Sequence, residues 1–252
     1  MKVAFFISST INVDDSAGHN FSYSTRRTFF NQEERFRQTQ FTLASLRLAY
    51  PGCKMYLYDC SRNPEEYREK FKYMNQDQFK YISIQDLDPE TNEICRTHPA
   101  KGYCEALCTE VFFRNYLEEL RQFDYIIKIS GRYFYTEFDK SVLNEENKNS
   151  FLNKHIRIWD WQESWNYPAE LNRNGKMHWA PSQTYAVGQG QLDNFYNNFF
   201  NIANWYRKNP DIAGFVDFEA IFFHVLLSHF PIVEVPWYTG GWGGSEGDYS
   251  EW

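Results

Sequence analysis

Small polar side chains end two expected strands in the first half of the chain. Ser8, Ser9 and Thr10 follow the apolar segment VAFFI, and Asp59 closes the segment KMYLYD. Hydroxyl and carboxylate groups at the carboxyl ends of parallel strands lie at the edge where open α/β sheets bind ligands. An acidic residue in the place of Asp59 commonly accepts hydrogen bonds from a ribose or a base, and equally often caps the following segment. Neither a GxGxxG nor a GxxxxGK[ST] motif is present, which argues against a standard dinucleotide fold or a P-loop.

A stretch rich in tryptophan and asparagine marks the second half of the chain. Its rings and polar side chains are Trp159, Trp161, Trp165, Tyr167 and Trp179, beside Asp160, Gln162, Asn166 and Asn172. Sugar C–H faces stack on aromatic rings while sugar hydroxyls need polar partners, so this composition is typical of a carbohydrate site. Large aromatics are also highly buried on average, which keeps a core role open. The candidate acceptor-binding residues are Trp159, Asp160, Trp165, Trp179 and Trp242.

Two carboxylates, Asp217 and Glu219, precede the apolar run AIFFH. In the plain interpretation Asp217 caps a helix and Glu219 lies in its first turn, where the helix dipole favours it. His178 and His224 have no convincing metal-binding neighbours in the sequence. Near the end of the chain, Trp237, Trp242 and residues 240–244 predict a closing flap, and the glycine-rich end GGWGGSEGDYSEW, residues 240–252, is expected to be mobile.

The cysteines predict reduced thiols. Five are present, an odd number without paired CxxC spacing, which argues against a zinc site or a disulfide framework. We expect buried, reduced side chains in a cytoplasmic protein, with Cys104 and Cys108 as small core residues. These residues are Cys53, Cys60, Cys95, Cys104 and Cys108.

Composition excludes several classes of protein. The 252 residues include 42% apolar, 23% charged and 19% aromatic residues, so the chain can bury a core and is not disordered. A net charge of −7 argues against nucleic acid as the main partner, because such binding needs clustered lysine and arginine. No apolar run is long enough for a transmembrane helix, and the start is too short for a secretory signal. Peripheral contact with a membrane stays open.

Strand and helix patterns alternate along the chain, which predicts a mostly parallel sheet. The expected strands are residues 3–8, 54–58, 81–84, 125–129, 156–159, 183–187 and 232–235. The expected helices are residues 33–50, 63–74, 101–121, 192–206 and 218–228, with an ordered functional loop at 162–179. We expect one α/β domain over residues 1–252, with a nucleotide-binding half at 1–135 and an acceptor-binding half at 136–252.

The segment KGYCEALCTEVFFRNYLEELRQFDYIIKISGRYFY, which begins at Lys101, carries the most specific pattern. Its KGxxE turn and KISGRY strand end resemble the GT-A nucleotide-sugar glycosyltransferases, in particular those of bacterial surface polysaccharides and related viral genes. The resemblance runs over residues 3–235 and implies a single GT-A-like, Rossmann-like α/β domain with a mostly parallel central sheet flanked by helices. It also implies a nucleotide-sugar donor and a carbohydrate acceptor as partners.

The resemblance assigns roles to residues of this chain. The implied donor-binding residues are Ser8, Ser9, Thr10, Asp59, Lys101, Gly102, Glu105, Ser130, Gly131 and Arg132. In inverting members of the family, a carboxylate at the start of a helix like the one after Gly214 removes the proton from the acceptor hydroxyl. Asp217 is the first candidate for this base and Glu219 the second.

The chain departs from the family at one important place. Family members usually carry a DxD motif at the end of this strand, where it holds Mn²⁺ or Mg²⁺ against the donor diphosphate. Here Ser130, Gly131 and Arg132 occupy that place. A guanidinium can offset phosphate charge in bidentate fashion, so Arg132, helped by Lys101 or Lys128, can replace the ion. We therefore expect no metal site and no required cofactor, although Mn²⁺ or Mg²⁺ stays compatible with the resemblance.

These observations predict a glycosyltransferase that moves a sugar from a nucleoside diphosphate sugar to a carbohydrate acceptor, with inversion. Two alternatives remain open at this stage. The first is a retaining transferase of similar fold, in which Asp217 or Glu219 orients or stabilises the substrate. The second is a noncatalytic glycan-binding module, because aromatic residues bind sugars without chemistry.

Overall fold

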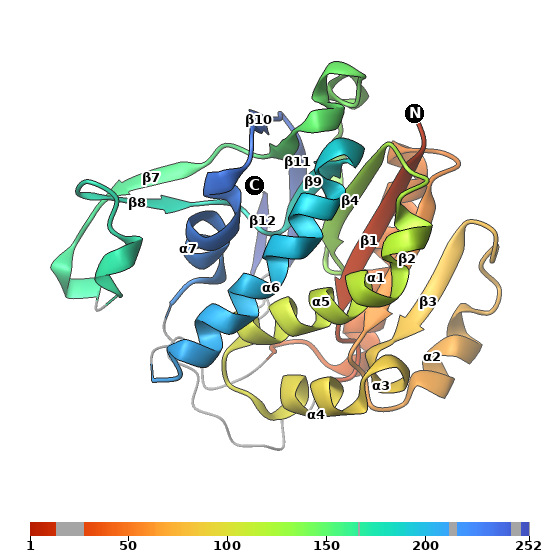
Figure 1. Ribbon diagram of the computed structural model, residues 1–252. Helices are drawn as coiled ribbons and strands as arrows, with labels where there is room; N and C mark the ends of the chain where they lie inside the picture. The colour runs from red at the N-terminus through yellow and green to blue at the C-terminus, as the bar shows by residue number, and fades with distance from the viewer. Residues whose placement is uncertain (14–27, 166, 212–215, 243–247, 252) are drawn as a thin grey trace.

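A seven-stranded sheet forms the centre of the protein, in the order β10-β6-β9-β4-β1-β2-β3 (Figure 1). The computed structural model describes residues 1–13, 28–165, 167–211, 216–242 and 248–251. Four neighbouring strand pairs are parallel, and β9 runs antiparallel to both β4 and β6. The predicted α/β class with a mostly parallel sheet is confirmed. The strands are β1 Val3–Ser9, β2 Lys54–Asp59, β3 Phe79–Ser83, β4 Tyr125–Ser130, β6 Phe151–Asn153, β9 Thr184–Gly188 and β10 Ile232–Glu234.

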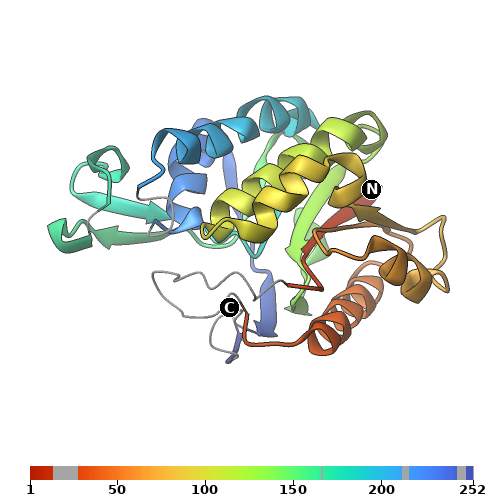
Figure 2. The ribbon, with the colours of Figure 1, turned by 90° about the horizontal axis from the view of Figure 1, so that it is seen from below.

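Helices cover both faces of this sheet (Figure 2). They are α1 Gln32–Ala49, α2 Pro64–Phe71, α3 Ile84–Leu87, α4 Pro89–Thr97, α5 Lys101–Leu120, α6 Leu192–Lys208 and α7 Phe218–Ile221. The pattern at residues 33–50 and 101–121 therefore located two long helices closely, while α3 and α4 were not predicted. Within the described residues, no helix is both long and apolar enough to cross a membrane.

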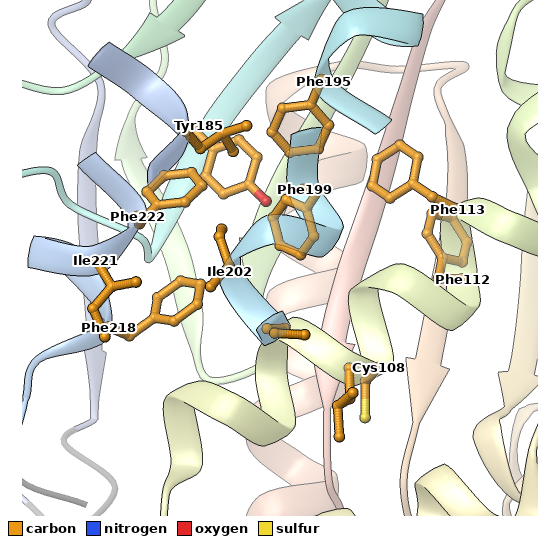
Figure 3. Close-up of a cluster of buried hydrophobic side chains, with 14 of the residues drawn as sticks. Cys108, Phe112, Phe113, Tyr185, Phe195, Phe199, Ile202, Phe218, Ile221 and Phe222 are labelled. Carbon is orange, nitrogen blue, oxygen red and sulfur yellow. The ribbon is translucent and has the colours of Figure 1, made fainter. Parts of the chain in front are cut away.

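The sheet separates two apolar clusters because successive side chains of a strand point to opposite faces. On β1, Phe6 packs with α5 and α6, whereas Phe5 and Ile7 pack on the side of α1. Figure 3 shows the first cluster, in which rings from α5, α6, α7 and β9 meet. Much of the aromatic excess of the sequence is thus core.

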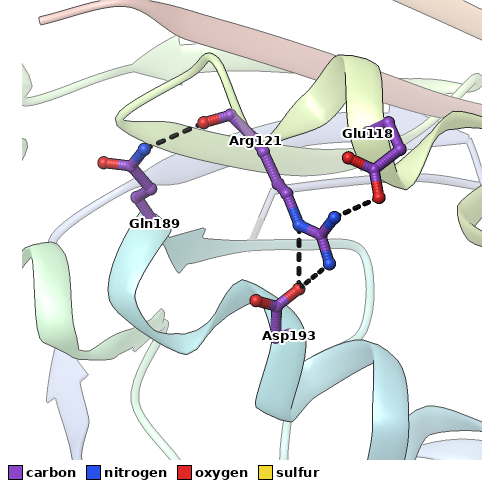
Figure 4. A network of polar contacts seen from close by, with 4 residues as sticks. All are labelled: Glu118, Arg121, Gln189 and Asp193. Carbon is purple, nitrogen blue, oxygen red and sulfur yellow. Dashed lines mark hydrogen bonds and ion pairs between the residues drawn. The ribbon is translucent and has the colours of Figure 1, made fainter.

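Local signals explain where the two longest helices of the first half begin and end. Asn31 and Glu34 form a reciprocal capping box at the start of α1. The chain leaves α1 through Gly52, whose φ of 84° is a conformation that favours glycine. The end of α5 is tied to α6, since Arg121 donates to Asp193 at 2.8 Å and to Glu118, and Gln189 donates to the Arg121 carbonyl (Figure 4). These contacts are exposed, so they orient the helices more than they stabilise them.

A second sheet corrects the expectation for the end of the chain. It joins β5 Tyr133–Glu137, β11 Tyr238–Trp242 and β12 Tyr249–Glu251 in the order β12-β11-β5. Residues 232–235 are therefore not the last strand, and the segment after them is ordered in β11 rather than a mobile tail. Trp237, expected in a flap, is fully buried. A Cβ at Gly241 would lie 2.4 Å from the Tyr133 ring, so glycine is needed for close strand packing; Gly243 and Gly244 lie outside the described residues.

A two-stranded arm extends from the body of the protein beside α7 (Figure 1). It consists of β7 Arg157–Asp160 and β8 Lys176–Trp179, which pair antiparallel. The strand expected at residues 156–159 is confirmed with a shift of one residue, and the loop expected at 162–179 includes β8. Short 3₁₀ turns occupy Lys140–Val142, Glu146–Asn149, Glu163–Trp165, Ala169–Leu171 and Gln189–Gln191.

The helix expected at residues 218–228 changes type along its length. It begins as α7, continues as a π-helical turn at Phe222–Leu226 and ends as a 3₁₀ turn at Leu227–His229. Single π turns are rare and are frequent at functional sites. Asp217 immediately precedes this segment.

Candidate functional site

A cavity of about 170 Å³ opens at the carboxyl edge of the central sheet, at the ends of β1, β2 and β4 and beside the start of α5. We call it the donor cavity, after the role that the sequence analysis predicts for its residues. Eight of the ten residues predicted for donor binding line it: Ser8, Ser9, Thr10, Lys101, Glu105, Ser130, Gly131 and Arg132. Its other lining residues are Val13, Arg35, Tyr58, Cys60, Cys95, Cys104 and Cys108. Strand ends predicted from separate segments thus meet at one place.

Sheet register produces this convergence. Ser8 lies beside Ser130 on the neighbouring strand, and Ser9 lies beside Asp59 on the other side. The turn after β4 is held against β1 because the Gly131 amide donates to the Ser8 carbonyl at 2.7 Å. A Cβ at Gly131 would lie 3.1 Å from that carbonyl oxygen, so a larger residue would push the two strand ends apart.

Asp59 and Gly102, the other two predicted donor residues, do not line the donor cavity. Asp59 is buried and accepts hydrogen bonds from the Ile11 amide at 3.0 Å and the Tyr81 hydroxyl at 2.9 Å. Burial raises its pKa, and these hydrogen bonds oppose that shift. Asp59 thereby fixes the chain that leaves β1. A Cβ at Gly102 would lie 2.3 Å from the Tyr206 hydroxyl, so this glycine allows α5 to pack closely on α6.

Arginine side chains give the donor cavity positive charge. Arg132 lines it and donates to the Trp242 carbonyl at 3.1 Å, rather than pairing with Glu137 or Asp139. Arg35, which the sequence analysis missed, also lines it and donates to the Thr10 carbonyl and to Thr28. A signal was available for Arg35, because a cation in the first turn of a helix opposes the helix dipole and so calls for another role.

A buried ion pair connects the donor cavity to the second half of the chain. Lys128 is buried and lies 2.6 Å from a Glu105 oxygen, so it neither reaches solvent nor lines the cavity. It also donates to the Ser130 hydroxyl at 2.8 Å and to the Ser182 carbonyl. The Ser182 hydroxyl in turn donates to Glu219 at 2.7 Å. Polar contacts therefore run without a break from Glu105 to Glu219.

The two candidate catalytic carboxylates have different surroundings. Asp217 makes no side-chain capping hydrogen bond, which contradicts the plain capping interpretation, and instead accepts from the Tyr167 hydroxyl at 3.3 Å. Displacement of water by nearby groups raises the pKa of Asp217, although its side chain is exposed. Glu219 is half-buried, and desolvation raises its pKa to about 7. Asp217 and Glu105 each add to that rise by repulsion, so Glu219 lies within electrostatic reach of both.

Asp217 faces a second hollow, which we call the aromatic pocket. It has a volume of about 490 Å³ and is lined by Trp159, Asp160, Gln162, Trp165, Tyr167, Met177 and Asp217. Three of the five predicted acceptor residues, Trp159, Asp160 and Trp165, are among these. Rings, amide and carboxylate groups are thus gathered as a carbohydrate site requires. Asn166 lies outside the described residues.

Trp179 and Trp242 lie elsewhere. Trp179 is buried on the arm, with the Arg157 guanidinium 5.1 Å from its ring centroid and Trp159 beside it. Trp242 is on β11, where its carbonyl accepts from Arg132 and its ring packs on Phe134. Trp242 therefore contacts the donor cavity through Arg132, and no pattern in the sequence indicates this contact.

The residues at the end of β4 do not fit a divalent cation. Ser130 and Arg132 offer a hydroxyl and a positive guanidinium where hard cations need carboxylate oxygens. In the part of the chain that the structure describes, no group of three or more histidine, cysteine or acidic side chains is arranged to hold a metal ion.

Comparisons with known proteins identify the fold. No protein-family model matches the chain, and no curated protein matches its sequence. Two crystal structures of the glycosyltransferase GlyE from Streptococcus pneumoniae TIGR4 match with a TM-score of 0.50 each, at 10% and 9% identity, over 93% and 92% of this chain. The chain spans 45% of the length of each. The galactosyltransferase LgtC, solved with donor and acceptor sugar analogs, matches at a TM-score of 0.45 and 9% identity, over 90% of this chain and 70% of LgtC.

The likeness to GlyE shows a shared fold. The prediction of a GT-A-like α/β fold is confirmed, and the structural neighbours are glycosyltransferases. At this level of identity the comparison assigns no role to any single residue, so the chemistry of the donor cavity and the aromatic pocket must be argued from their own geometry.

Proposed function

We propose that the chain transfers a sugar from a nucleoside diphosphate sugar to a carbohydrate acceptor, with inversion at the anomeric carbon. The observation that supports this proposal is the presence of two pockets of different chemistry, which polar contacts from Glu105 through Lys128 and Ser182 to Glu219 connect. The donor cavity offers cations and hydroxyls, and the aromatic pocket offers rings and a carboxylate. The fold, shared with a glycosyltransferase, agrees with this assignment.

The donor cavity has the chemistry that a diphosphate requires. Among the described residues, Arg35, Lys101 and Arg132 line it beside one carboxylate, Glu105, which is paired with Lys128. Hydroxyls of Ser8, Ser9 and Thr10 lie at the same edge and can bond ribose or phosphate oxygens. Guanidinium groups bind phosphate oxygens through two parallel hydrogen bonds, which fixes direction as well as charge.

Asp217 is the proposed general base. An acceptor sugar stacked on Trp159 or Trp165 would place a hydroxyl near the Asp217 carboxylate. Asp217 takes the hydroxyl proton, the acceptor oxygen bonds to the anomeric carbon, and the bond from that carbon to the diphosphate oxygen breaks. Attack opposite the leaving group inverts the anomeric configuration. The raised pKa of Asp217 brings it closer to the working pH, which favours proton transfer.

Arg132 and Lys101 would stabilise the charge that grows on the leaving diphosphate. We propose that these side chains, with Arg35, take the place of the ion that the family's DxD motif would hold, so no metal or other cofactor is required. Lys128 reaches the cavity only through Ser130 and Glu105 and acts as a positioning residue.

We further propose one cytoplasmic domain that acts on a growing surface polysaccharide. Residues 1–135 would supply the donor half and residues 136–252 the acceptor half. The pockets support this division, since the described residues that line the donor cavity end at Arg132 and those that line the aromatic pocket begin at Trp159.

A nucleotide screen tests the proposal. The chain is heated alone and with UDP, GDP, dTDP or CMP, and the midpoint of thermal unfolding is compared. We expect one nucleotide to raise the midpoint and Arg132→Ala to abolish that shift. With the matching nucleotide sugar, NMR of the product then reports the anomeric configuration, and retention would overturn the inverting mechanism. Binding of oligosaccharides with no nucleotide response would favour a noncatalytic glycan-binding module instead.

A further inference from the structure

Four of the five cysteines converge on one wall of the donor cavity, although they come from three separate segments. Cys60 follows β2, Cys95 lies on α4, and Cys104 and Cys108 lie one turn apart on α5. None of the four is in a disulfide bond, and all four line the cavity. Figure 3 shows Cys108 at the edge of the aromatic cluster, on the turn of α5 next to Phe112.

Three of these sulfurs are in contact, and we call them the thiol cluster. The Cys60 and Cys108 sulfurs lie 2.8 Å apart, and those of Cys108 and Cys95 lie 3.4 Å apart. A disulfide bond is about 2.0 Å long, so Cys60 and Cys108 need to approach by less than about 1 Å to form one. Sulfurs this close on different elements are placed for reaction with each other.

The surroundings also favour a thiolate at Cys60. Hydrogen bonds with Cys108 and Cys95 lower the pKa of the Cys60 thiol, against an opposing effect of burial. The same contacts raise the pKa of Cys108, which therefore keeps its proton. Cys53 is a useful contrast, because burial away from the cluster raises its pKa to about 11. The thiolate is the reactive form of cysteine, so the cluster is the reactive thiol site among the five.

We propose that Cys60 and Cys108 form a redox-active pair that reacts with a small hydroperoxide entering through the donor cavity. The Cys60 thiolate attacks the peroxide, its sulfur bonds to the terminal oxygen, and the O–O bond breaks; the other oxygen leaves as hydroxide from hydrogen peroxide, or as alkoxide from an organic hydroperoxide, and takes up a proton. The Cys108 sulfur then attacks the Cys60 sulfenic acid, the S–S bond forms, and water leaves. Two thiols give up two electrons in total, and the peroxide accepts them.

The disulfide would alter the donor cavity. It would tie the segment after β2 to α5, whose first two turns carry Lys101 and Glu105 of the cavity lining. Oxidation therefore weakens nucleotide binding, and a bound nucleotide shields the thiols from peroxide. This second consequence rests on the proposed function, whereas formation of the disulfide does not.

The first experiment follows the thiols alone. The reduced full-length chain is treated with hydrogen peroxide, and free thiols and nonreduced peptides are analysed by mass spectrometry. We expect two thiols per chain to be lost and a Cys60–Cys108 peptide pair to appear, with both changes reversed by dithiothreitol. Cys108→Ser should leave Cys60 as a sulfenic acid that dimedone captures. Cys53→Ala, the matched control, should behave like the parent chain.

Three results would overturn the pair. The first is survival of all five thiols under conditions that oxidise free cysteine. The second is a disulfide that joins Cys108 to Cys95 instead of to Cys60. The third is absence of dimedone capture in a Cys108→Ser chain that unfolds at the same temperature as the parent chain. The last condition excludes misfolding as the cause.

The second experiment adds a nucleotide found by thermal shift. At a nucleotide concentration of about ten times the Kd, only about a tenth of the chains have no nucleotide bound. We therefore expect peroxide oxidation of the thiols to slow about tenfold. An unchanged oxidation rate with nucleotide bound would contradict the proposal that nucleotide and peroxide enter the same cavity. If no nucleotide binds, the proposed function fails, while the peptide analysis still decides whether the thiol pair exists.

Discussion

The donor cavity and the aromatic pocket are built in different ways. The donor cavity lies where β1, β2 and β4 end, so the register of the central sheet fixes its hydroxyls and its Gly131 turn. The aromatic pocket lies on the β7–β8 arm, where all four residues of β7 are exposed and the strands pair with each other alone. The donor cavity is thus built on the central sheet, whereas the aromatic pocket is built mainly on an arm outside that sheet.

Their charges differ as well. Arginine and lysine dominate the donor cavity, whereas Asp217 and Asp160 line the aromatic pocket, with Asp160 paired to Lys176. Such a division suits a reaction in which a phosphate leaves on one side and a hydroxyl loses a proton on the other. Under the proposed function, donor and acceptor binding should therefore be separable by mutation, except at the junction, by which we mean Asp217 and Glu219.

The largest effect is expected at this junction. Asp217→Asn keeps the size of the side chain and its hydrogen bond with Tyr167 but cannot accept a proton. We expect the rate of sugar transfer to fall by about 10² to 10⁴, with the fold and nucleotide affinity retained. Steady-state transfer assays and a thermal-shift titration of the nucleotide measure the two quantities.

Glu219→Gln is the matched comparison for Asp217→Asn. If Asp217→Asn transfers sugar at a near-normal rate and Glu219→Gln shows a large loss, then Asp217 is not the general base. The role of general base would then be assigned to Glu219, whose pKa of about 7 also suits proton transfer.

A smaller effect is expected from the donor cavity. Arg132→Ala removes a charged contact to phosphate and should cost about 2 to 4 kcal/mol in donor binding or turnover. The acceptor KM should stay unchanged, because Arg132 does not line the aromatic pocket. Isothermal titration with the nucleotide and transfer kinetics check both statements.

A chelator is the control for Arg132. EDTA should change the activity of the parent chain little if guanidinium groups take the role of the ion. Strict dependence on added Mn²⁺ would contradict that role, and it would place the metal ligands outside the end of β4.

The donor cavity was largely predictable from sequence, and the reason is local. Ser8, Ser130 and their neighbours follow apolar strands directly, and parallel strands bring their carboxyl ends to one edge whatever lies between them. The kinds of side chain that form the aromatic pocket were predictable from sequence, but the particular residues that line it were not. Trp179 and Trp242 have the same composition signal as Trp165, and only the fold separates them.

Other features depend on contacts that a single sequence does not reveal. Cys60 and Cys108 are separated by 48 positions, and nothing near either one indicates the other. Gly240 and Gly241 have low strand propensity, which favoured a mobile tail, yet β11 needs them because a Cβ would clash with Phe134 and Tyr133. Tertiary packing overrides local preference in both cases.

The pH dependence of stability tests the link between the two pockets. The pKa of Glu219 is about 7 in the folded chain, above its ordinary value of 4.5, so the folded state binds the proton more tightly. The stability that this proton provides is complete below about pH 4.5 and is lost as the pH rises through about 7. Glu219→Gln removes this dependence and keeps an acceptor for Ser182. Relative to the parent, the variant should gain about 2 kcal/mol of unfolding free energy between pH 5 and pH 8, a figure reduced for partial exposure. Urea unfolding of parent and variant at pH 5 and pH 8 measures this change. If the difference in unfolding free energy between variant and parent is the same at both pH values, Glu219 titrates normally.

The smallest effect is expected on the arm, where two adjacent residues of β7 offer a matched pair. Trp159 lines the aromatic pocket and is 38% exposed, whereas Ile158, the residue before it, is 57% exposed and does not line the pocket. A sugar stacked on an indole ring gains about 0.5 to 1.5 kcal/mol, so Trp159→Ala should raise the acceptor KM about two- to tenfold. Donor affinity should not change, because the arm contributes nothing to the donor cavity. Ile158→Ala removes an exposed apolar side chain that does not line the pocket and should leave both constants as they were. Equal effects of the two substitutions would mean that they act through the stability of the arm, and an effect of Trp159→Ala on nucleotide binding would contradict the separation of the two pockets.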